Sequence, residues 1–196
     1  MTPQTKFYLS FGRHERYGSD TPIEREDMIA AFLTGRQLKS WLPECATVYH
    51  SPLARAVETA RFEALGMEIE HLLCVEALEE SAPKFVVQRF IDELLNYTDE
   101  TVQYYHFVTH LPIVEKLGLP FLGAGEVCLL TAKNKDEMLA ENYKVQVIKK
   151  PEISAEIWQK LALTPENLRT LSADEIYLQI KSKYQNTTRE KGFEPL

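Results

Sequence analysis

Residues 6–14, which read KFYLSFGRH, form the stretch that decides the fold predicted from this sequence. The run up to Gly12 is mostly aromatic and apolar, and the glycine closes it, which is the pattern of a strand buried in a sheet. Arg13 and His14 follow this strand directly. We therefore expect a guanidinium and an imidazole at the carboxyl end of a buried strand.

Outward from this strand, short β-type runs alternate with amphipathic helical runs. Thr21-Pro22 and Glu24 predict a helix start, because threonine is a common N-cap, proline suits the first helical position and the glutamate completes a capping box. Ser51-Pro52 repeats this signal for a second helix. The other predicted strands are residues 46–50, 69–75, 102–109, 126–132 and 143–148, and two further helices begin near residues 83 and 112.

Strands that alternate with helices of this size imply βαβ crossovers, which give a mainly parallel sheet covered by helices on both faces. We predict an α/β fold of the three-layer α/β/α sandwich type. Beyond Pro151 the pattern is helical only, with helix starts at Thr164 and Ser172 and a last helix over about residues 173–184. We expect an α/β domain over residues 1–150 and a C-terminal helical extension over residues 151–196 that packs on or beside it.

Composition and charge exclude several classes of protein. The chain has 196 residues, 44% of them hydrophobic, and a formal net charge of −7, so a basic surface for nucleic acid is not expected. No apolar run approaches the roughly 18 residues of a membrane span, and residues 1–6 lack the layout of a signal peptide. The three cysteines form no CxxC motif. We expect a reduced, cytoplasmic protein, monomeric by preference, with no nucleic-acid or membrane partner.

Side chains that suit a phosphate follow three of the predicted strands. Arg13 and His14 follow the first, Ser51 follows the second with Arg55 one turn into the next helix, and His110 follows a later one. In an open parallel sheet, ligands bind beyond the carboxyl ends of the strands. A phosphoryl dianion needs fixed donors and positive charge, and a helix N-terminus adds backbone N–H groups. The sequence therefore predicts a phosphate site, without a metal or other cofactor, since no His or Asp cluster has ligand spacing.

Three blocks of sequence carry a family resemblance. FYLSFGRHE at residues 7–15 resembles the arginine-histidine-glycine signature of the histidine phosphatase superfamily, which is also called phosphoglycerate mutase-like. YHSPLARAVETA at residues 49–60 is similar to the family's serine-proline-leucine-x-arginine-alanine block. VTHLPIV at residues 108–114 looks like the second-histidine block, in the form most like the SixA-type phosphohistidine phosphatases. The resemblance covers roughly residues 5–132 and implies the phosphoglycerate mutase-like fold.

The resemblance implies a role for each matching residue. His14 would be the nucleophile that forms a covalent phosphohistidine intermediate, and Arg13, Arg55 and His110 would bind the phosphoryl oxygens, with His110 also counted as catalytic. In the mutase-like branch a catalytic glutamate follows a leucine by two positions, which places the acid at Glu80. A neutral imidazole is a competent nucleophile near neutral pH, and a general acid contributes about 10²–10⁴-fold.

Glu15 departs from the family pattern, which has a glycine after the nucleophilic histidine. The backbone carbonyl of that glycine orients the histidine in the family, and a glutamate adds a charge that opposes a phosphate. Arg16, the next residue, either pairs with Glu15 or adds a third cation to the phosphate-binding set. Ser51 completes that set, although it also reads as a helix cap.

We expect a metal-independent phosphatase that removes phosphate from protein phosphohistidine. The first alternative is a phosphomonoesterase for a small phosphorylated metabolite, which Glu80 favours because phosphohistidine phosphatases generally lack that carboxylate. The second alternative is a module of the same fold that has lost catalysis and binds phosphate or a phosphorylated partner, which Glu15 and the helical extension favour.

Overall fold

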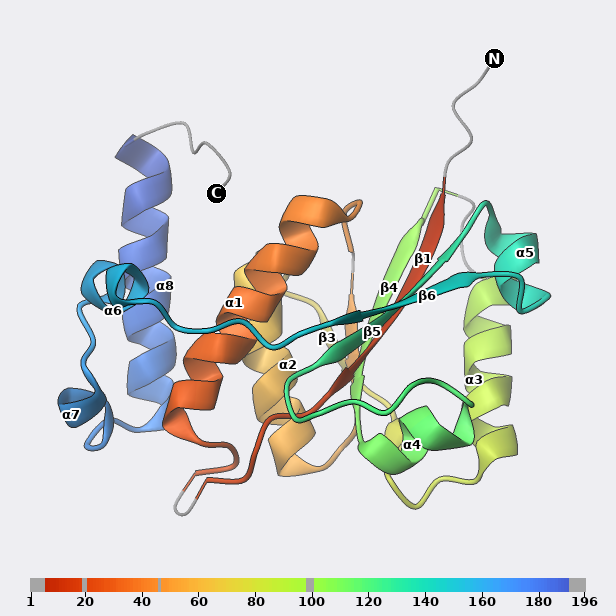
Figure 1. Ribbon diagram of the computed structural model, residues 1–196, viewed down its shortest axis with the longest axis horizontal. Coiled ribbons are helices and arrows are strands. Elements are labelled where there is room, and N and C mark those ends of the chain that lie inside the picture. The colour runs from red at the N-terminus through yellow and green to blue at the C-terminus, as the bar shows by residue number, and fades with distance from the viewer. Residues whose placement is uncertain (1–5, 19–20, 46, 98–100, 191–196) are drawn as a thin grey trace.

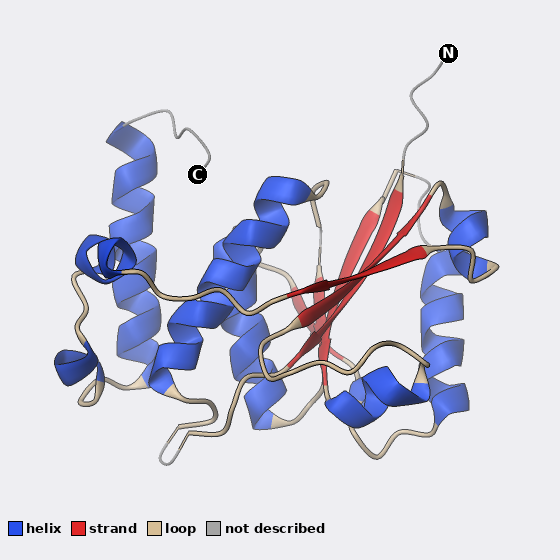
Figure 2. Cartoon of the chain, in the orientation of Figure 1, coloured by secondary structure: helices blue, strands red, loops and turns tan. Residues whose placement is uncertain are grey.

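Six strands form one mixed sheet in the part of the chain that the computed structural model describes, namely residues 6–18, 21–45, 47–97 and 101–190 (Figure 2). They are β1 (Phe7–Arg13), β2 (Val48–His50), β3 (Leu72–Cys74), β4 (Tyr104–Thr109), β5 (Val127–Ala132) and β6 (Lys144–Ile148). Their order across the sheet is β3-β2-β4-β1-β5-β6. The first four in this order are parallel, whereas β5 runs antiparallel to both β1 and β6.

Helices cover both faces of this sheet (Figure 1). The helices are α1 (Arg25–Trp41), α2 (Ala54–Met67), α3 (Lys84–Tyr97), α4 (Leu111–Lys116), α5 (Lys135–Leu139), α6 (Ala155–Leu161), α7 (Pro165–Leu168) and α8 (Ala173–Glu190), with a 3₁₀ turn at η1 (Glu76–Leu78). α1 and α2 pack on one face, and α3, α4 and α5 pack on the other. The predicted three-layer α/β/α sandwich with a mainly parallel sheet is therefore confirmed.

Side chains of the central strand β1 point alternately to the two faces of the sheet. Phe7, Leu9 and Phe11 belong to the core under α3 and α4, and the ring of Phe11 stacks on that of Phe107 in β4 with 4.9 Å between centroids. Ser10 points to the opposite face, beneath α1 and α2, where its hydroxyl contacts that of Tyr104 at 2.8 Å. Because side chains alternate along a strand, this buried position on both faces explains the nearly continuous apolar run in the sequence.

Two of the predicted helix starts, at Thr21 and at Ser51, lie too early in the sequence. Thr21 does not cap α1, because its hydroxyl donates to the carbonyl of Ile23 at 2.6 Å and closes a turn there. Ile23 is fully buried, so its side chain packs into the core before the helix begins. Ser51 does not cap α2 either, since the helix begins three residues later and the Ser51 hydroxyl contacts the ring of His110.

The C-terminal helices pack against the outer side of α1, on the far side from the sheet (Figure 1). The linker that follows β6 crosses α1 to reach them. The Arg25 Nε–H of α1 donates to the carbonyl of Leu171 at 2.7 Å, which ties the helix start to this extension. The two parts share a buried apolar cluster that includes Ile23, Met28, Ile29, Phe32, Phe62, Leu161, Leu163, Leu168, Ile176 and Ile180. The extension therefore completes the burial of α1, and the domain boundary near residue 150 stays a prediction.

Several elements differ from the prediction in their bounds. β3 and β4 begin later than expected, α8 continues to Glu190, and helix α5 was not expected from the sequence. Residue 46 at the start of the predicted second strand, the N-terminal residues 1–5 and the C-terminal residues 191–196 lie outside the described part of the chain. Within the described ranges, no helix combines the length and apolar character needed to cross a membrane.

Candidate active site

The carboxyl ends of β1, β2 and β4 bring the predicted site residues together. Arg13 ends β1 beside Thr109 of β4, and the backbone N–H of His14 donates to the Thr109 carbonyl at 3.0 Å. His110 follows β4 directly, and its ring centroid lies 4.9 Å from that of His14. The Ser51 N–H after β2 bonds in the same way to the backbone of β4. Parallel pairing thus places residues that are distant in sequence at one edge of the sheet.

Two hydrogen bonds fix the tautomer and the orientation of the His14 ring. Its Nδ1–H donates to the backbone carbonyl of Glu15 at 2.6 Å, and the Arg55 Nε–H donates to its Nε2 at 3.0 Å. A carbonyl only accepts and a guanidinium N–H only donates, so the ring proton is on Nδ1 and the lone pair is on Nε2. A nucleophilic imidazole requires this lone pair to face its target.

Burial keeps the His14 ring in its neutral form. Desolvation lowers the pKa of His14 to about 4, since the residue is only 9% exposed and the imidazolium is penalised. The hydrogen bond to the Glu15 carbonyl opposes this shift, whereas the charges of Arg55 and Arg13 add to it. The unliganded site therefore holds an unprotonated Nε2 throughout the neutral pH range.

We expect the acid limb of the pH–rate profile to lie near pH 4 rather than near the ordinary histidine value of 6.5. The neutral ring is the reactive form, so kcat/KM falls only as pH drops through the pKa of His14. The free energy of unfolding also falls as the pH drops. The His14 ring takes up a proton near pH 6.5 in the unfolded chain but only near pH 4 in the folded one, so this part of the stability is complete above pH 6.5 and is lost towards pH 4. An NMR titration of the ring alongside kcat/KM checks this, and a limb near 6.5 contradicts it.

Arg55, in the first turn of α2, contacts three other residues of the site. Its guanidinium contacts Nε2 of His14, the hydroxyl of Tyr17 and Oε2 of Glu80. It also lies over the Tyr17 ring, with Cζ 4.8 Å from the centroid. Carboxylate and phosphoryl oxygens accept hydrogen bonds from arginine in the same manner. The Glu80 oxygen therefore marks a position at the Arg55 guanidinium that an anion can take.

The two ring nitrogens of His110 have different surroundings. Nε2 lies 2.8 Å from the Ser51 hydroxyl, whereas Nδ1 is buried with no hydrogen-bond partner among the described residues and lies 3.8 Å from Oε2 of Glu80. Burial, with the charges of His14 and Arg55, lowers the pKa of His110 to about 3, so the ring is neutral before a ligand binds. If the Ser51 hydroxyl donates to Nε2, Nδ1 carries the proton and faces an incoming anion as a donor.

Ser51 thus takes a different place from the predicted phosphate contact. Its hydroxyl lies against His110 and accepts from the Leu53 N–H at 3.3 Å, and its side chain is fully buried. Ser51 does not line the hollow that holds the other site residues. The structure therefore gives it the geometry of a group that orients His110.

Arg13 and Arg16 have separate surroundings. Arg13 donates from Nη1 to the Leu122 carbonyl at 2.8 Å, and its Nε is buried with no hydrogen-bond partner among the described residues. Arg16 donates from Nε and Nη2 to Asp27 at 2.8 and 2.9 Å. The expected pair of Arg16 with Glu15 is thus replaced by one with Asp27, and the guanidinium of Arg16 is already committed when the site is empty. Arg13 retains an Nε donor without a partner among the described residues, whereas Arg16 lines the same hollow with its guanidinium bonded to Asp27.

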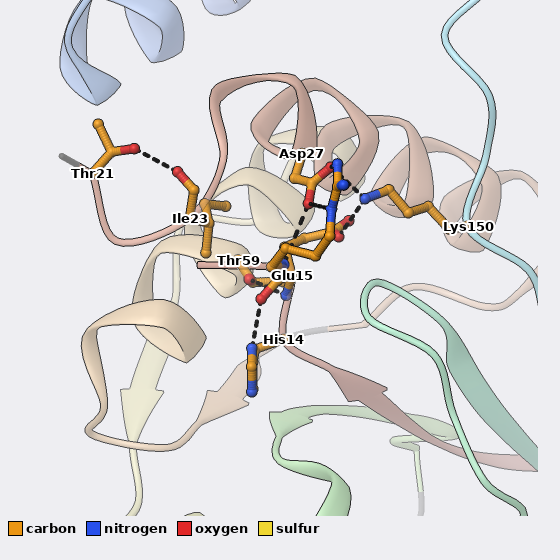
Figure 3. A network of polar contacts seen from close by, with 8 residues as sticks. His14, Glu15, Thr21, Ile23, Asp27, Thr59 and Lys150 are labelled. Carbon is orange, nitrogen blue, oxygen red and sulfur yellow. Dashed lines mark hydrogen bonds and ion pairs between the residues drawn. The ribbon is translucent and has the colours of Figure 1, made fainter. Parts of the chain in front are cut away.

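The Glu15 carboxyl is turned away from the anion position. Figure 3 shows it directed towards Lys150, with the His14 ring on the other side of the backbone. Its Oε2 accepts from the Lys150 Nζ at 2.7 Å, while its backbone N–H donates to the Thr59 hydroxyl at 3.0 Å. The carboxyl expected to oppose a phosphate therefore contacts a lysine instead, and the Glu15 carbonyl remains available to His14.

Sequence reasoning missed four residues of this region. Tyr17 contacts Arg55 at the rim of the site, and Thr59, Asp27 and Lys150 surround Glu15. Lys150 is 135 residues from Glu15, and no local pattern marks a pair of that kind. The available signal in the sequence was Glu15 itself, in a position where the family pattern has glycine. The structure shows that this glutamate is buried, and a buried carboxyl requires a partner.

The site residues line an open hollow of about 570 Å³. Its walls include Arg13, His14, Arg55, Glu80 and His110, with Leu111 and Pro112 at the start of α4. Within the described ranges, no group of three or more His, Cys, Asp or Glu side chains is placed to hold a metal ion. The donors and the lone pair on His14 give this hollow the chemistry of an oxyanion site beside a nucleophile.

The fold of this chain is shared with several solved structures. No protein-family model and no curated protein sequence matches the chain. The solved protein histidine phosphatase SixA complexed with tungstate is 18% identical, with a TM-score of 0.62, over 74% of this chain and 97% of its own. A candidate phosphohistidine phosphatase SixA from Nakamurella multipartitia is 16% identical, with a TM-score of 0.58, over 75% and 98%. A mycobacterial glucosyl-3-phosphoglycerate phosphatase is 13% identical, with a TM-score of 0.52, over 75% and 100%.

These likenesses establish the class of fold. The chain has the α/β fold that the SixA protein and the mycobacterial phosphatase share, which confirms the fold implied by the three sequence blocks. The matched part is about three quarters of this chain and nearly the whole of each of those structures.

Proposed function

We propose that this chain is a phosphatase in which His14 attacks a phosphoryl group, and that its substrate is phosphohistidine on a protein. Nε2 of His14 forms a bond to phosphorus while the bond from phosphorus to the substrate imidazole breaks, and the leaving nitrogen takes a proton from water in the open hollow. Water then attacks the phosphohistidine, releases orthophosphate and returns the lone pair to Nε2. Phosphoryl transfer of this kind depends mainly on positioning and on stabilisation of charge.

The orientation of the His14 ring carries this proposal. Nδ1 is held by the Glu15 carbonyl and Nε2 points to Arg55, so the ring is neutral and its lone pair is directed to the anion position. Among the described residues, Nε of Arg13 and Nδ1 of His110 have no hydrogen-bond partner, and both residues line the same hollow as Arg55. Nδ1 of His110 is a donor when the Ser51 hydroxyl donates to Nε2. A bound dianion also favours the protonated form of His110, which strengthens its hydrogen bond.

The openness of the hollow and the fold likeness favour a protein substrate. The site lies at the edge of the sheet, and only the short segment that contains η1 separates β3 from α3 beside it. A phosphoryl group on a protein side chain can reach an open site of this kind. The likeness to the SixA structures supports the same choice, whereas the glucosyl-3-phosphoglycerate phosphatase shares the fold and acts on a small metabolite, as its name states.

A small-metabolite phosphomonoesterase is the second candidate, and the place of Glu80 favours it. Glu80 contacts Arg55 and lies 3.8 Å from Nδ1 of His110, so a carboxyl is within the site. A phosphate ester has a poor leaving oxygen, which needs a proton from an acid more than an imidazole does. The loss of catalysis considered for Glu15 is the least favoured of the three, because the carboxyl of Glu15 is directed to Lys150.

The choice between the two substrate classes is tested by measuring hydrolysis of both by the wild-type protein and by a Glu80→Gln variant. We expect the wild-type protein to hydrolyse a phosphorylated histidine-containing domain faster than a panel of sugar phosphates, and Glu80→Gln to lower that rate by less than about 10-fold. If the protein prefers an ester and Glu80→Gln costs it about 10²–10⁴-fold, the second candidate is the function. Glu79→Gln is the matched control, since Glu79 bonds to the exposed Ser81 hydroxyl outside the hollow.

A further inference from the structure

A network of ion pairs surrounds Glu15, the residue that orients the His14 ring. Lys150 Nζ contacts Oε2 of Glu15 at 2.7 Å and also Oδ1 of Asp27 (Figure 3). Asp27 in turn accepts both guanidinium bonds from Arg16 and, at 3.3 Å, the backbone N–H of Arg16. Residues 15 and 16 are therefore held from α1 and from the linker after β6, on the side opposite to His14.

The two carboxyls in this network, those of Glu15 and Asp27, are deeply buried and depend on the cations beside them. Glu15 is 0% exposed and Asp27 is 1% exposed. Burial raises the pKa of Glu15 to about 8 against the pull of Lys150, with the charges of Asp27 and Glu63 adding to the rise. Burial acts in the same direction on Asp27, but the bonds from Arg16 and Lys150 outweigh it and hold the pKa of Asp27 below its usual value. Without its cation, a buried carboxyl loses most of the reason to stay in place.

Gly125 provides the space that the Glu15 carboxyl occupies. A Cβ at Gly125 would lie closer than 3.0 Å to three atoms of that carboxyl, and the φ of Gly125 is +75°. The Glu15 side chain thus fits between a glycine on the loop before β5 and a lysine after β6. Neither partner belongs to the three blocks of sequence that resemble the family.

We propose that Lys150 is a positioning residue for His14, acting by holding the Glu15 carboxyl away from the hollow and so fixing the backbone carbonyl that orients the ring. The inference rests on the proposed function in that it assigns His14 as the nucleophile. Glu15 contributes its carbonyl to His14 at 2.6 Å and its carboxyl to Lys150 at 2.7 Å, so one residue links the two. Without Lys150 the carboxyl either stays in place as the neutral acid or leaves for the hollow, and the Glu15 backbone keeps its N–H bond to Thr59 but loses the contact that holds it through the side chain.

This arrangement also assigns a task to the C-terminal extension. Lys150 lies on the linker that crosses α1 towards α6, and Asp27 lies in the first turn of α1 (Figure 1). The apolar cluster shared by α1 and the extension holds these two segments together. The packing of the extension therefore fixes the position from which Lys150 reaches Glu15.

A Lys150→Met variant tests the inference. We expect kcat to fall about 100-fold, the scale of a displaced nucleophile, while KM changes far less. Nitrogen-15 NMR of the histidine rings should show the proton of His14 shared between Nδ1 and Nε2 in the variant, and on Nδ1 alone in the wild type. Lys149→Met is the matched control, because Lys149 is its neighbour, is 75% exposed in its side chain and pairs with Glu126 at the surface.

Two further variants separate positioning from general stabilisation. Lys150→Arg should retain most of the activity, because it keeps the cation. Glu15→Gly combined with Lys150→Met should be at least about 10-fold more active than Lys150→Met alone, since it removes the unpaired carboxyl and leaves the backbone carbonyl. If Lys150 only stabilised the fold, removing Glu15 as well would not restore activity. A double variant with no higher kcat than Lys150→Met therefore overturns the inference.

The two proposals fail in different ways. A folded Lys150→Met protein with wild-type kcat and an unchanged His14 tautomer overturns the role of Lys150, whatever the substrate. If the wild-type protein shows no turnover but its His14 tautomer responds to Lys150→Met as described, the role of Lys150 is supported and the proposed phosphatase function is overturned. The NMR measurement needs no substrate, which makes this separation possible.

Discussion

Replacing His14 with alanine is expected to lower the rate of phosphate release by roughly 10³-fold or more, because the variant has no group that can form the phosphoenzyme. The lone pair on Nε2, which accepts from the Arg55 Nε–H in the empty site, is the group that we propose attacks phosphorus. The donors of Arg13, Arg55 and His110 remain, so phosphate binding should persist and the loss should fall on kcat. A rapid-quench experiment should trap an acid-labile phosphoryl group on the wild-type protein and none on His14→Ala.

His71→Ala is the matched control for this substitution. His71 precedes β3 and is exposed, so its removal changes the same residue type away from the hollow. Thermal unfolding of both variants shows whether a loss of activity reflects a loss of fold. Hydrolysis by His14→Ala at the wild-type rate, or a phosphoryl group trapped on another residue, would falsify the assignment of the nucleophile.

Replacing Gly125 with alanine is expected to lower the free energy of unfolding by about 2–5 kcal/mol, the sum of a strained backbone and an overpacked contact. The φ of +75° places Gly125 in the left-handed region, where a side chain costs energy. The added Cβ also meets the Glu15 carboxyl, whose place is fixed by Lys150. Chemical denaturation of the purified protein measures the change.

Two variants divide this cost into its parts. Gly118→Ala has nearly the same φ, +74°, but nothing lies within 4 Å of the added Cβ, so it measures the backbone part, about 1–2 kcal/mol. Adding Glu15→Gly to Gly125→Ala should recover the contact part, about 1–3 kcal/mol. If Gly125→Ala costs no more than Gly118→Ala, the Glu15 carboxyl does not occupy the space beside Gly125.

Much of the sheet and of the site's location was predictable from local patterns. The apolar run before Gly12 predicts β1, and the alternation of strands with helices predicts the layers that the structure confirms. Parallel strands meet at one edge, so strand-end residues such as His14 and His110 were expected to converge, and their rings lie 4.9 Å apart. Their chemical roles stay predictions, which the substitutions above examine.

Other features were not predictable because tertiary contacts override the local signal. The Thr21-Pro22 pattern predicts a helix start, but the burial of Ile23 delays the helix. The Ser51-Pro52 pattern predicts the start of α2, but in the folded chain the Ser51 hydroxyl lies against the ring of His110 and α2 begins at Ala54. Tyr17 lies in a segment without a periodic pattern, so only its contact with Arg55 reveals its place in the site.

The sequence by itself determined which residues stand at the ends of the strands, because period, caps and glycines act over a few neighbouring positions. It also marked Glu15 as an anomaly next to His14. Only the tertiary structure decided where the Glu15 carboxyl lies, since its partners Lys150, Asp27 and Gly125 come from three other parts of the chain. A buried charge is stabilised by groups brought to it in space, and the spacing of residues along the chain does not encode that choice.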